Sequence, residues 1–280
     1  MPGRRIAFVD DDLDNYHANV FLAAMRTELR DHGYAVSSCT ALKEEKGRAW
    51  AEENGIPYHS DPAETNRNAD FFMILAPSSP ETHVPLCEKF LPFGKPVWVD
   101  KTFAPDLAAA ERIFALADKH GAPVDTASAL RYTAVQEYAG EIGRDKIRHV
   151  IAWCPGGKIH EYLVHPVETI VSVLGPQVER VMRRGADHEA QVLIDFSGGR
   201  TAVANVYLKT KTPYAASVTT SDATRYIEVD TGKLFVDALG GILDFFDRGK
   251  PTIDRRESLM IRRIMDAALD PGSAGEWVRL

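Results

Sequence analysis

Two short segments contain side chains that could move a proton on and off a small molecule. Residues 94–101 form an apolar run that ends on Lys101. A second segment contains Glu161, His165 and Glu168, which would share one face of a helix because residues three and four apart are neighbours there. A histidine titrates near neutral pH, and partial burial lowers the pKa of a lysine, so both can serve a reacting oxygen. The two segments therefore indicate acid–base chemistry at a substrate hydroxyl.

The elements that would hold Lys101 alternate between strand and helix patterns in the first half of the chain. Short apolar runs, as in strands buried on both faces, are separated by helical patterns. The strand candidates are residues 6–9, 34–39, 71–75 and 97–99. The helix candidates are 15–31, 43–54, a stretch after the third strand that ends at residue 90, and 105–120. This alternation predicts a doubly wound parallel sheet. Lys101 would then lie at the carboxyl end of a strand, where open α/β sheets bind ligands.

The second half of the chain has a different pattern. After a helical stretch over residues 161–174, strand patterns follow one another without helices between them, which predicts an antiparallel sheet. These strands are residues 178–182, 191–196, 201–208, 215–219 and 226–229, and helices follow around 239–246 and 255–269. We therefore predict an α/β chain of two domains. Residues 1–127 form the doubly wound domain, and residues 128–280 form an α+β domain with an open, mainly antiparallel sheet.

Composition and charge exclude several classes of protein. The 280 residues carry a net charge of -7, which argues against binding to nucleic acid or to an anionic membrane surface. No apolar run approaches the roughly 20 residues that span a bilayer, and the apolar stretch behind the N-terminal arginines is too short for a signal peptide. The three cysteines, Cys39, Cys87 and Cys154, predict neither a disulfide framework nor a zinc site. We expect a cytoplasmic protein that acts on a small molecule.

Three groups of residues make the chain resemble the glucose-fructose oxidoreductase and inositol dehydrogenase family (Gfo/Idh/MocA). The family's Glu-Lys-Pro sequence after a strand is similar to Asp100-Lys101-Thr102. Its Gly-x-x-x-Asp-x-Gly-x-His-x-x-Asp motif is matched in spacing by Gly157, Glu161, Leu163, His165 and Glu168. A third match lies between residues 246 and 278. The resemblance covers nearly the whole chain and implies a Rossmann domain followed by a domain with an open antiparallel sheet.

The resemblance implies a reaction and roles for its residues. A hydride would pass between NAD or NADP and a secondary alcohol of a sugar, polyol or related small molecule. Lys101 would polarise the reacting oxygen, His165 would take the hydroxyl proton, and Glu161 would orient His165. Arg131 and Glu168 are candidates for contact with the substrate, although Arg131 could instead pair with an acid. The neighbouring histidine of the same motif, residue 160, is an alternative to His165.

The family's cofactor site implies contacts from residues that follow the strands of the first domain. The residues at those positions are Asp10, Asp11, Asp12, Thr40, Ala76, Pro77, Ser78, His83 and Lys101. The first of these turns departs from the family, because aspartates replace the glycines that let a backbone approach the pyrophosphate. The acidic residue expected for the ribose hydroxyls is also missing near Thr40, and Lys43 and Arg48 follow. Those two cations are more compatible with a 2′-phosphate than with a free hydroxyl.

The aspartate turn has three alternative interpretations. It could cap the following helix, because Asp and Asn favour N-cap positions. Clustered carboxylates could also hold a divalent cation, although we assign no metal site. A phosphoacceptor pocket, as in response-regulator receivers, is excluded, because the strand over residues 71–75 ends in Ala76 and Pro77 rather than in an aspartate.

Other functions stay open at this stage. Lys101 could be a surface lysine and His165 a helix-capping histidine. A chain that lost its cofactor with the glycines would be a binding or regulatory protein of the same fold, and a lyase or hydrolase is a third class. The open sheet of the second domain also predicts a homodimer or homotetramer, as in the family.

Overall fold

The computed structural model describes residues 4–186 and 188–280 and divides into two compact units. The first unit comprises the residues up to Ala127 together with Phe235–Ile253. The second comprises Ser128–Leu234 and Asp254–Leu280. The sequence-based division into residues 1–127 and 128–280 did not include the return of Phe235–Ile253 to the first unit, because the apolar stripe of a helix does not say which sheet it covers.

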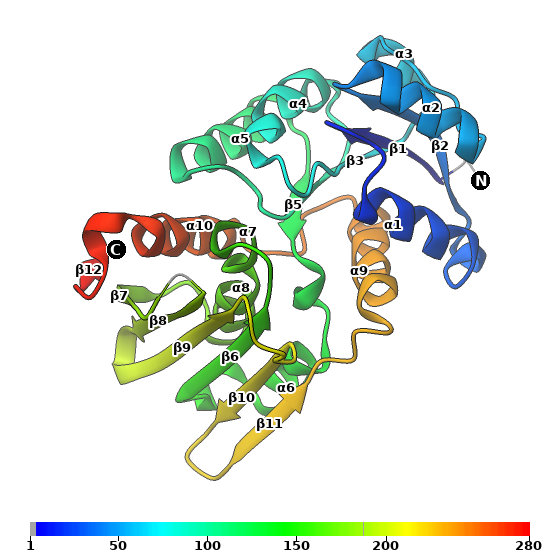
Figure 1. Cartoon of the computed structure of the whole chain (residues 1–280). Coiled ribbons are helices and arrows are strands. Elements are labelled where there is room, and N and C mark those ends of the chain that lie inside the picture. The colour runs from blue at the N-terminus through cyan, green and yellow to red at the C-terminus, as the bar shows by residue number, and fades with distance from the viewer. Residues whose placement is uncertain (1–3, 187) are drawn as a thin grey trace. The chain divides into compact units, whose positions relative to one another are not determined.

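The first unit is a doubly wound α/β domain (Figure 1). Its strands are all parallel, in the order β2-β1-β3-β4-β5. The strands are β1 (Arg4–Asp10), β2 (Tyr34–Ala41), β3 (Phe71–Ile74), β4 (Val97–Asp100) and β5 (Val124–Ala127). The helices are α1 (Tyr16–Arg26), α2 (Glu44–Asn54), α3 (Pro62–Arg67), α4 (His83–Phe90), α5 (Leu107–His120) and α9 (Leu234–Arg248). The predicted fold class is confirmed.

The strand order reverses between β1 and β3, and this decides where the helices lie. From β1 the chain moves to one side of the sheet, and from β3 it moves to the other through β4 and β5. Because such crossovers are right-handed, α1 covers one face of the sheet, and α4 and α5 lie side by side on the other (Figure 1). The reversal also leaves a crevice at the carboxyl ends of β1 and β3, which is where this class of sheet binds ligands.

Helix α9 covers the same face as α1. The ring of Phe235 makes an edge contact with that of Phe21 on α1, with centroids 5.6 Å apart. Further along, Phe246 stacks on Phe71 of β3 at 4.7 Å. The hydroxyl of Tyr34 donates a hydrogen bond to the Asp247 carboxylate at 2.8 Å. A helix that is distant in the sequence therefore completes the apolar core of the first unit.

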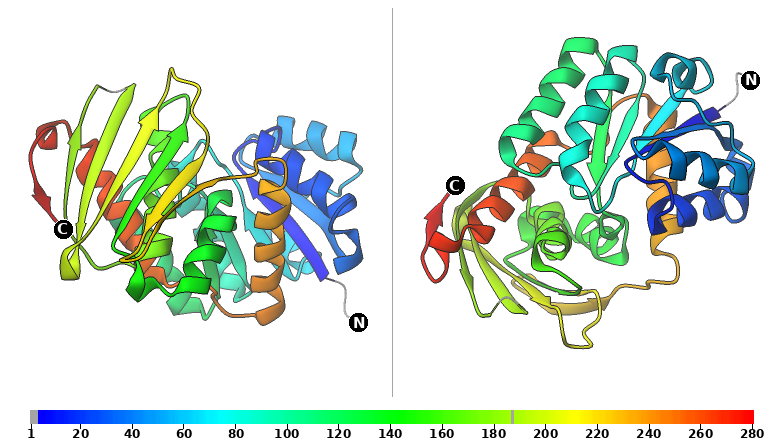
Figure 2. Two further views of the ribbon diagram at one scale, coloured as in Figure 1. Left: turned by 90° about the horizontal axis from the view of Figure 1, so that it is seen from below. Right: turned by 45° about the horizontal axis from the view of Figure 1, so that its top comes forward.

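The second unit contains a mixed sheet with helices on one face (Figures 1 and 2). Its strand order is β11-β10-β6-β9-β8-β7-β12, and every neighbouring pair is antiparallel except β6 with β9. The strands are β6 (His149–Pro155), β7 (Val178–Arg184), β8 (Glu189–Phe196), β9 (Arg200–Tyr207), β10 (Ala215–Thr219), β11 (Thr224–Glu228) and β12 (Val278–Arg279). The helices are α6 (Ala134–Ile142), α7 (Ile159–Tyr162), α8 (Val164–Leu174) and α10 (Arg255–Leu269). The expected open, mainly antiparallel sheet is confirmed.

Some elements of both units were not predicted from the sequence. They are strands β5, β6 and β12 and helices α3 and α6, and β6 supplies the one parallel pair described in the second sheet. The helix predicted over residues 161–174 is two helices, α7 and α8, that meet at Leu163 with helical dihedral angles there. None of the helices in the described part of the chain is both long and apolar enough to cross a bilayer.

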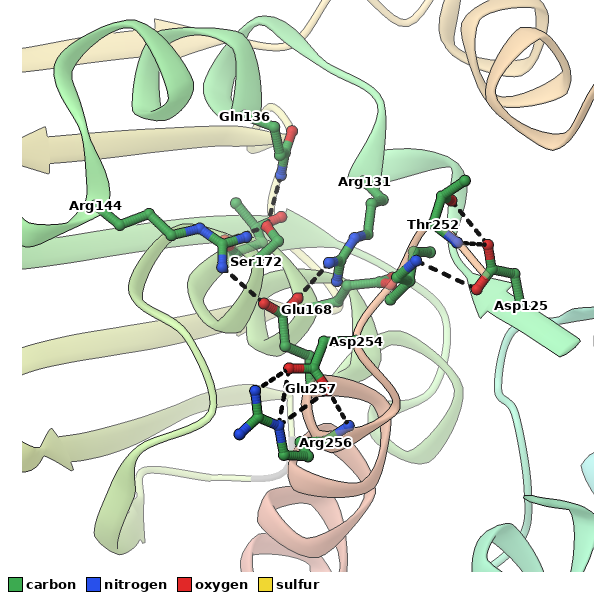
Figure 3. Close-up of polar contacts among 12 residues, drawn as sticks. Asp125, Arg131, Gln136, Arg144, Glu168, Ser172, Thr252, Asp254, Arg256 and Glu257 are labelled. Carbon is green, nitrogen blue, oxygen red and sulfur yellow. Dashed lines mark hydrogen bonds and ion pairs between the residues drawn. The ribbon is translucent and has the colours of Figure 1, made fainter. Parts of the chain in front are cut away.

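A buried carboxylate fixes the segment that follows α9. Asp125, on β5, is 2% exposed. It accepts hydrogen bonds from the Thr252 amide and hydroxyl, each at 2.7 Å, and from the Ile253 amide at 3.3 Å (Figure 3). Backbone amides left without a partner in the protein interior are costly, so this carboxylate holds residues 252 and 253 against β5.

Replacing Asp125 with Ala should therefore destabilise the first unit by about 2–4 kcal/mol, because three hydrogen bonds to a buried carboxylate are lost at once. Replacing Thr252 with Val removes only the hydroxyl and should cost about 1 kcal/mol. Urea denaturation followed by tryptophan fluorescence measures both changes. Equal losses in the two variants would show that the backbone amides do not depend on Asp125.

Candidate active site

The carboxyl ends of β1, β3 and β4 bring several of the predicted residues to one edge of the first sheet. Strand β1 ends at Asp10, the segment after β3 contains Ala76 and Pro77, and β4 ends at Asp100 before Lys101. Because the strands are parallel and β1 pairs with β3, the first two of these ends are neighbours. The structure therefore gathers a carboxylate, backbone amides and an ammonium group at the switch point of the sheet.

Asp10 is the most enclosed of the aspartates in the first turn, at 1% exposure. Its Oδ1 accepts hydrogen bonds from the amides of Asp11, Asp12 and Ala76 at 2.7, 3.1 and 3.1 Å. Its Oδ2 accepts one from the Asn15 side chain at 2.8 Å. Burial raises the pKa of Asp10 to about 7, and these hydrogen bonds oppose the rise. The turn is closed around an anion that belongs to the chain itself.

Two other aspartates of the turn, Asp11 and Asp12, have cationic partners. The Lys43 ammonium lies 2.7 Å from the Asp11 carboxylate, and that of Lys46 lies 3.1 Å from Asp12. The residue that caps α1 is Asn15, whose side-chain oxygen accepts from the Ala18 amide at 3.1 Å. Among residues 4–186 and 188–280, no group of three or more His, Cys, Asp or Glu side chains is arranged to hold a metal ion. Lysines thus offset the charges of Asp11 and Asp12, whereas Asp10 is held by neutral amides.

Lys101 is half-buried and held from two sides. Its ammonium donates a hydrogen bond to the Pro77 carbonyl at 3.0 Å, and its amide donates one to Asp100 at 2.7 Å. The other oxygen of the buried Asp100 carboxylate pairs with Nδ1 of His17, on the first turn of α1. The His17 ring in turn makes edge contacts with Phe21 and Phe235. Sequence reasoning missed His17, because nothing in its neighbourhood marks it as a partner of a residue 83 positions away.

The loop after β3 contains two side chains that we expected to contact the cofactor. Ser78 is exposed. His83 is completely buried, and its ring nitrogens face the carbonyl oxygens of Leu75 and Phe103, both at 2.9 Å. The ring of His83 thus joins the segment after β3 to the segment after β4. In this buried position the His83 ring links the two segments and does not project from the edge of the sheet.

A cavity of about 180 Å³ lies where β2 ends. Its lining includes Thr40, Leu42, Tyr58, Ser60 and Lys89. Thr40, the residue predicted near the ribose, therefore lines this cavity.

The cations that we related to a 2′-phosphate near this cavity have carboxylate partners. Lys43 pairs with Asp11, and the Arg48 guanidinium lies 2.6 Å from Glu44, also on α2. Neither cation is therefore held ready for an added phosphate.

In the second unit, His165 is the one residue of α8 that is not buried. The helix is apolar around most of its surface because α6, α10 and the sheet enclose it. The His165 ring makes edge contacts with the rings of Tyr162 and Tyr214, with centroids 5.7 and 5.9 Å away. Burial raises the pKa of Tyr214 above its usual range. The spacing of three residues could have indicated Tyr162, whereas Tyr214 comes from a distant loop.

The Glu161 carboxylate, which we predicted to orient His165, has other partners. It lies 3.2 Å from the Lys158 ammonium and 3.7 Å from Nε2 of His160. Helical spacing places Glu161 one turn before His165, but the contacts of this carboxylate are with its neighbours on α7 and the residue before it. The rings of the two tyrosines, rather than Glu161, lie against His165.

Arg131 and Glu168 belong to a buried network of charges (Figure 3). Arg131 forms an ion pair with Glu257 on α10, and Arg144 lies 2.8 Å from the same carboxylate. Glu168 is 2% exposed and accepts a hydrogen bond from the Ser128 amide at 2.7 Å. Burial raises the pKa of Glu168, and the nearby Arg131 opposes the rise. These residues tie the first residues of the unit to α8 and α10.

Solved structures of low sequence identity share the fold over the whole chain. A probable dehydrogenase from Thermotoga maritima has 15% identity and a TM-score of 0.81, covering 98% of both chains. The myo-inositol 2-dehydrogenase from Lactobacillus plantarum has 14% identity and a TM-score of 0.82, covering 99% of both. An oxidoreductase from Agrobacterium radiobacter, in complex with NAD+, L-tartaric acid and magnesium, has 14% identity and a TM-score of 0.77, covering 98% of both. Identities this low establish the fold alone.

Sequence comparison identifies the family of the first unit. None of the curated proteins compared with the chain is significantly similar to it in sequence. Residues 15–128 match the family model of Gfo/Idh/MocA, described as an oxidoreductase family with an NAD-binding Rossmann fold. The match begins after the aspartates of the first turn and includes Lys101. The first unit is therefore similar to the Gfo/Idh/MocA family of oxidoreductases over residues 15–128.

Proposed function

We propose that this chain is an oxidoreductase that uses NAD or NADP to interconvert a secondary alcohol of a sugar, a polyol or a related small molecule with the corresponding carbonyl. One observation carries the proposal. The half-buried Lys101 follows β4 at the ligand-binding edge of a Rossmann domain whose family consists of NAD-binding oxidoreductases. The fold shared with a myo-inositol 2-dehydrogenase supports a polyol or a sugar as the substrate class.

A nicotinamide dinucleotide suits one part of this edge and not another. The Lys101 ammonium and the Pro77 carbonyl, which accepts its hydrogen bond, suit the part of this edge that would hold the nicotinamide. The amides of the first turn, which would meet the pyrophosphate, are already bonded to Asp10. A bound nicotinamide supplies the hydride chemistry, and the protein supplies position and charge. The chain's own part in the reaction is then the handling of the proton at the substrate oxygen.

In this proposal, Lys101 polarises the substrate oxygen. Its ammonium uses one N–H on the Pro77 carbonyl, which leaves two donors for a ligand. Asp100 acts as a positioning residue, because it accepts the Lys101 amide with one oxygen and meets His17 with the other. The pairing with His17 links the position of Lys101 to the start of α1.

His165 exchanges the hydroxyl proton, since it is the side chain of α8 that reaches the surface of its unit. The rings of Tyr162 and Tyr214 restrict its orientation. We assign Arg131 and Glu168 a supporting role, which is to hold the helix that carries His165.

Replacing Lys101 with Met should lower turnover by more than about tenfold and leave the thermal unfolding midpoint unchanged, because the ammonium acts on the reacting oxygen. The assay is reduction of NAD+ or NADP+ with a panel of polyols and sugars. His165→Asn should cause a loss of similar size. Lys119→Met, at an exposed position on α5, is the matched control and should retain full activity. Full activity in Lys101→Met would refute the assignment.

A second candidate function is that of a cofactor-free binding or regulatory protein. The Asp10 carboxylate in the first turn favours it, because that anion holds amides that a pyrophosphate would need. Titration of the purified protein with NADH and NADPH, followed by cofactor fluorescence, separates the two functions. Saturable binding of either cofactor favours the oxidoreductase, and no binding up to millimolar concentration favours the second candidate.

We also propose that the chain forms a homodimer or homotetramer through the face of the second sheet that has no helices. Strand register places Tyr226, Ser217, Ile151, Val203, Leu193 and Met182 in one row across that face. None of these side chains is buried, and Tyr226 is 55% exposed. A row of mostly apolar, accessible side chains on a sheet face suits contact with a second copy, because burying apolar surface drives association.

Replacing Leu193 with Asp, in the middle of this row, should convert the assembly to a smaller species, because a charge would be buried against apolar groups. Light scattering coupled to size-exclusion chromatography measures the mass. Lys146→Asp, at an exposed position of the same unit, should leave the mass unchanged. If the native protein already has the mass of one chain, the proposed interface is wrong.

A further inference from the structure

Several donors of the first βα turn are used within the chain. In Rossmann domains the amides after the first strand and the start of the next helix meet the pyrophosphate of the cofactor. Here the amides of Asp11 and Asp12 point to Asp10 Oδ1, and the amide of Ala76, from the neighbouring strand end, points to the same atom. The two sides of the crevice thus converge on one carboxylate oxygen.

A second side chain closes the start of the helix. The Asn15 side-chain oxygen accepts from the Ala18 amide at 3.1 Å, so a donor of the first turn of α1 is also occupied. Its nitrogen donates to Asp10 Oδ2 at 2.8 Å and to the Asp12 carbonyl at 2.7 Å. Asn15 therefore locks Asp10 in place as well as capping the helix. The family has glycines in this turn, which would leave the same donors uncovered.

We propose that the Asp10 carboxylate is a built-in anion that takes the place of the cofactor's pyrophosphate at the first βα turn, so that a dinucleotide binds this turn only after displacing Asp10 from the amides. The inference rests on the proposed function in assuming that the cofactor of the family approaches this edge of the sheet. It explains why a turn with four aspartates can fold tightly, because one of them supplies the negative charge for which the converging amides are suited.

Charge makes the displacement necessary. Asp10 is buried, and each hydrogen-bond partner described for it is a neutral amide, so its own charge is not cancelled by an adjacent cation. A phosphate beside an ionised Asp10 would add like charge next to a buried carboxylate. The lysines that contact this turn, Lys43 and Lys46, are paired with Asp11 and Asp12. The turn therefore holds either Asp10 or a phosphate on these amides, and not both.

The test compares full-length wild type with Asp10→Gly, with NADH and NADPH as fluorescent probes. Glycine frees the amides, so Asp10→Gly should bind at least one of the two cofactors about tenfold or more tightly than wild type does. Asp14→Asn, at an exposed position of the same turn, is the matched control. It removes a charge from the same turn but leaves Asp10 on the amides, and it should change the dissociation constant by less than about threefold.

Each outcome separates the inference from the proposed function. Tighter binding by Asp10→Gly supports the inference, and if wild type then shows no binding, the native chain does not use the cofactor through this turn and the oxidoreductase proposal fails. Saturable binding by wild type that Asp10→Gly does not improve overturns the inference and leaves the oxidoreductase proposal standing. No binding by either protein overturns both.

A second measurement tests the burial of the Asp10 carboxyl group and needs no cofactor. Burial raises the pKa of Asp10 from 3.8 to about 7, so across that range the folded protein keeps a proton that the unfolded chain has lost. The free energy of unfolding of wild type, minus that of Asp10→Asn, should therefore fall as pH rises from 3.8 to about 7 and level off above. The subtraction removes the contributions of Asp12, Lys43 and other groups. Above about pH 7 the carboxylate is the main form of Asp10. A difference that is constant with pH would show that Asp10 binds its proton equally in the folded and unfolded chains, so that it is not enclosed by the turn, and would overturn the proposal.

Discussion

The Asp10 carboxylate joins the ends of two parallel strands. One of its oxygens accepts the amides that follow β1 and the amide of Ala76 beyond β3, so the spacing of the switch-point crevice depends on a single side chain. Asn15 then connects the same carboxylate to the start of α1. Lys101 lies further along this edge, held by the Pro77 carbonyl one residue beyond Ala76. The geometry around Lys101 and the closure of the first turn are therefore parts of one hydrogen-bonded arrangement.

In the second unit, the candidate histidine, His165, lies on a helix whose other residues are all buried. Helix α8 is buried along its length except at His165, and charges that are rarely buried, such as Glu168, are satisfied by backbone amides and by arginines below the helix. Such a network costs desolvation energy. It also fixes a helix on both sides, which is what a side chain used for proton transfer requires.

Much of the first unit could be predicted from the sequence because its signals are local. The buried strands and the lysine at the end of β4 follow from short apolar runs and from what ends them. The remaining features depend on partners distant in the sequence. Four neighbouring aspartates look alike in the sequence, and only burial makes Asp10 different from Asp11. In the same way, the pairing of Glu257 with Arg131 removes that arginine from the surface, which no spacing rule reveals.

The chain passes between its units after Ala127, after Leu234 and after Ile253. During synthesis on the ribosome, α9 therefore emerges only after most of the second sheet, and until then Phe71 has no Phe246 to cover it. The first unit cannot complete its core independently, unlike a domain made from one continuous segment. A fragment cut after residue 127 would keep all five strands of the parallel sheet and α1, but it would expose the apolar surface that α9 covers. The core of the first unit is thus completed by a segment that follows most of the second sheet in the chain.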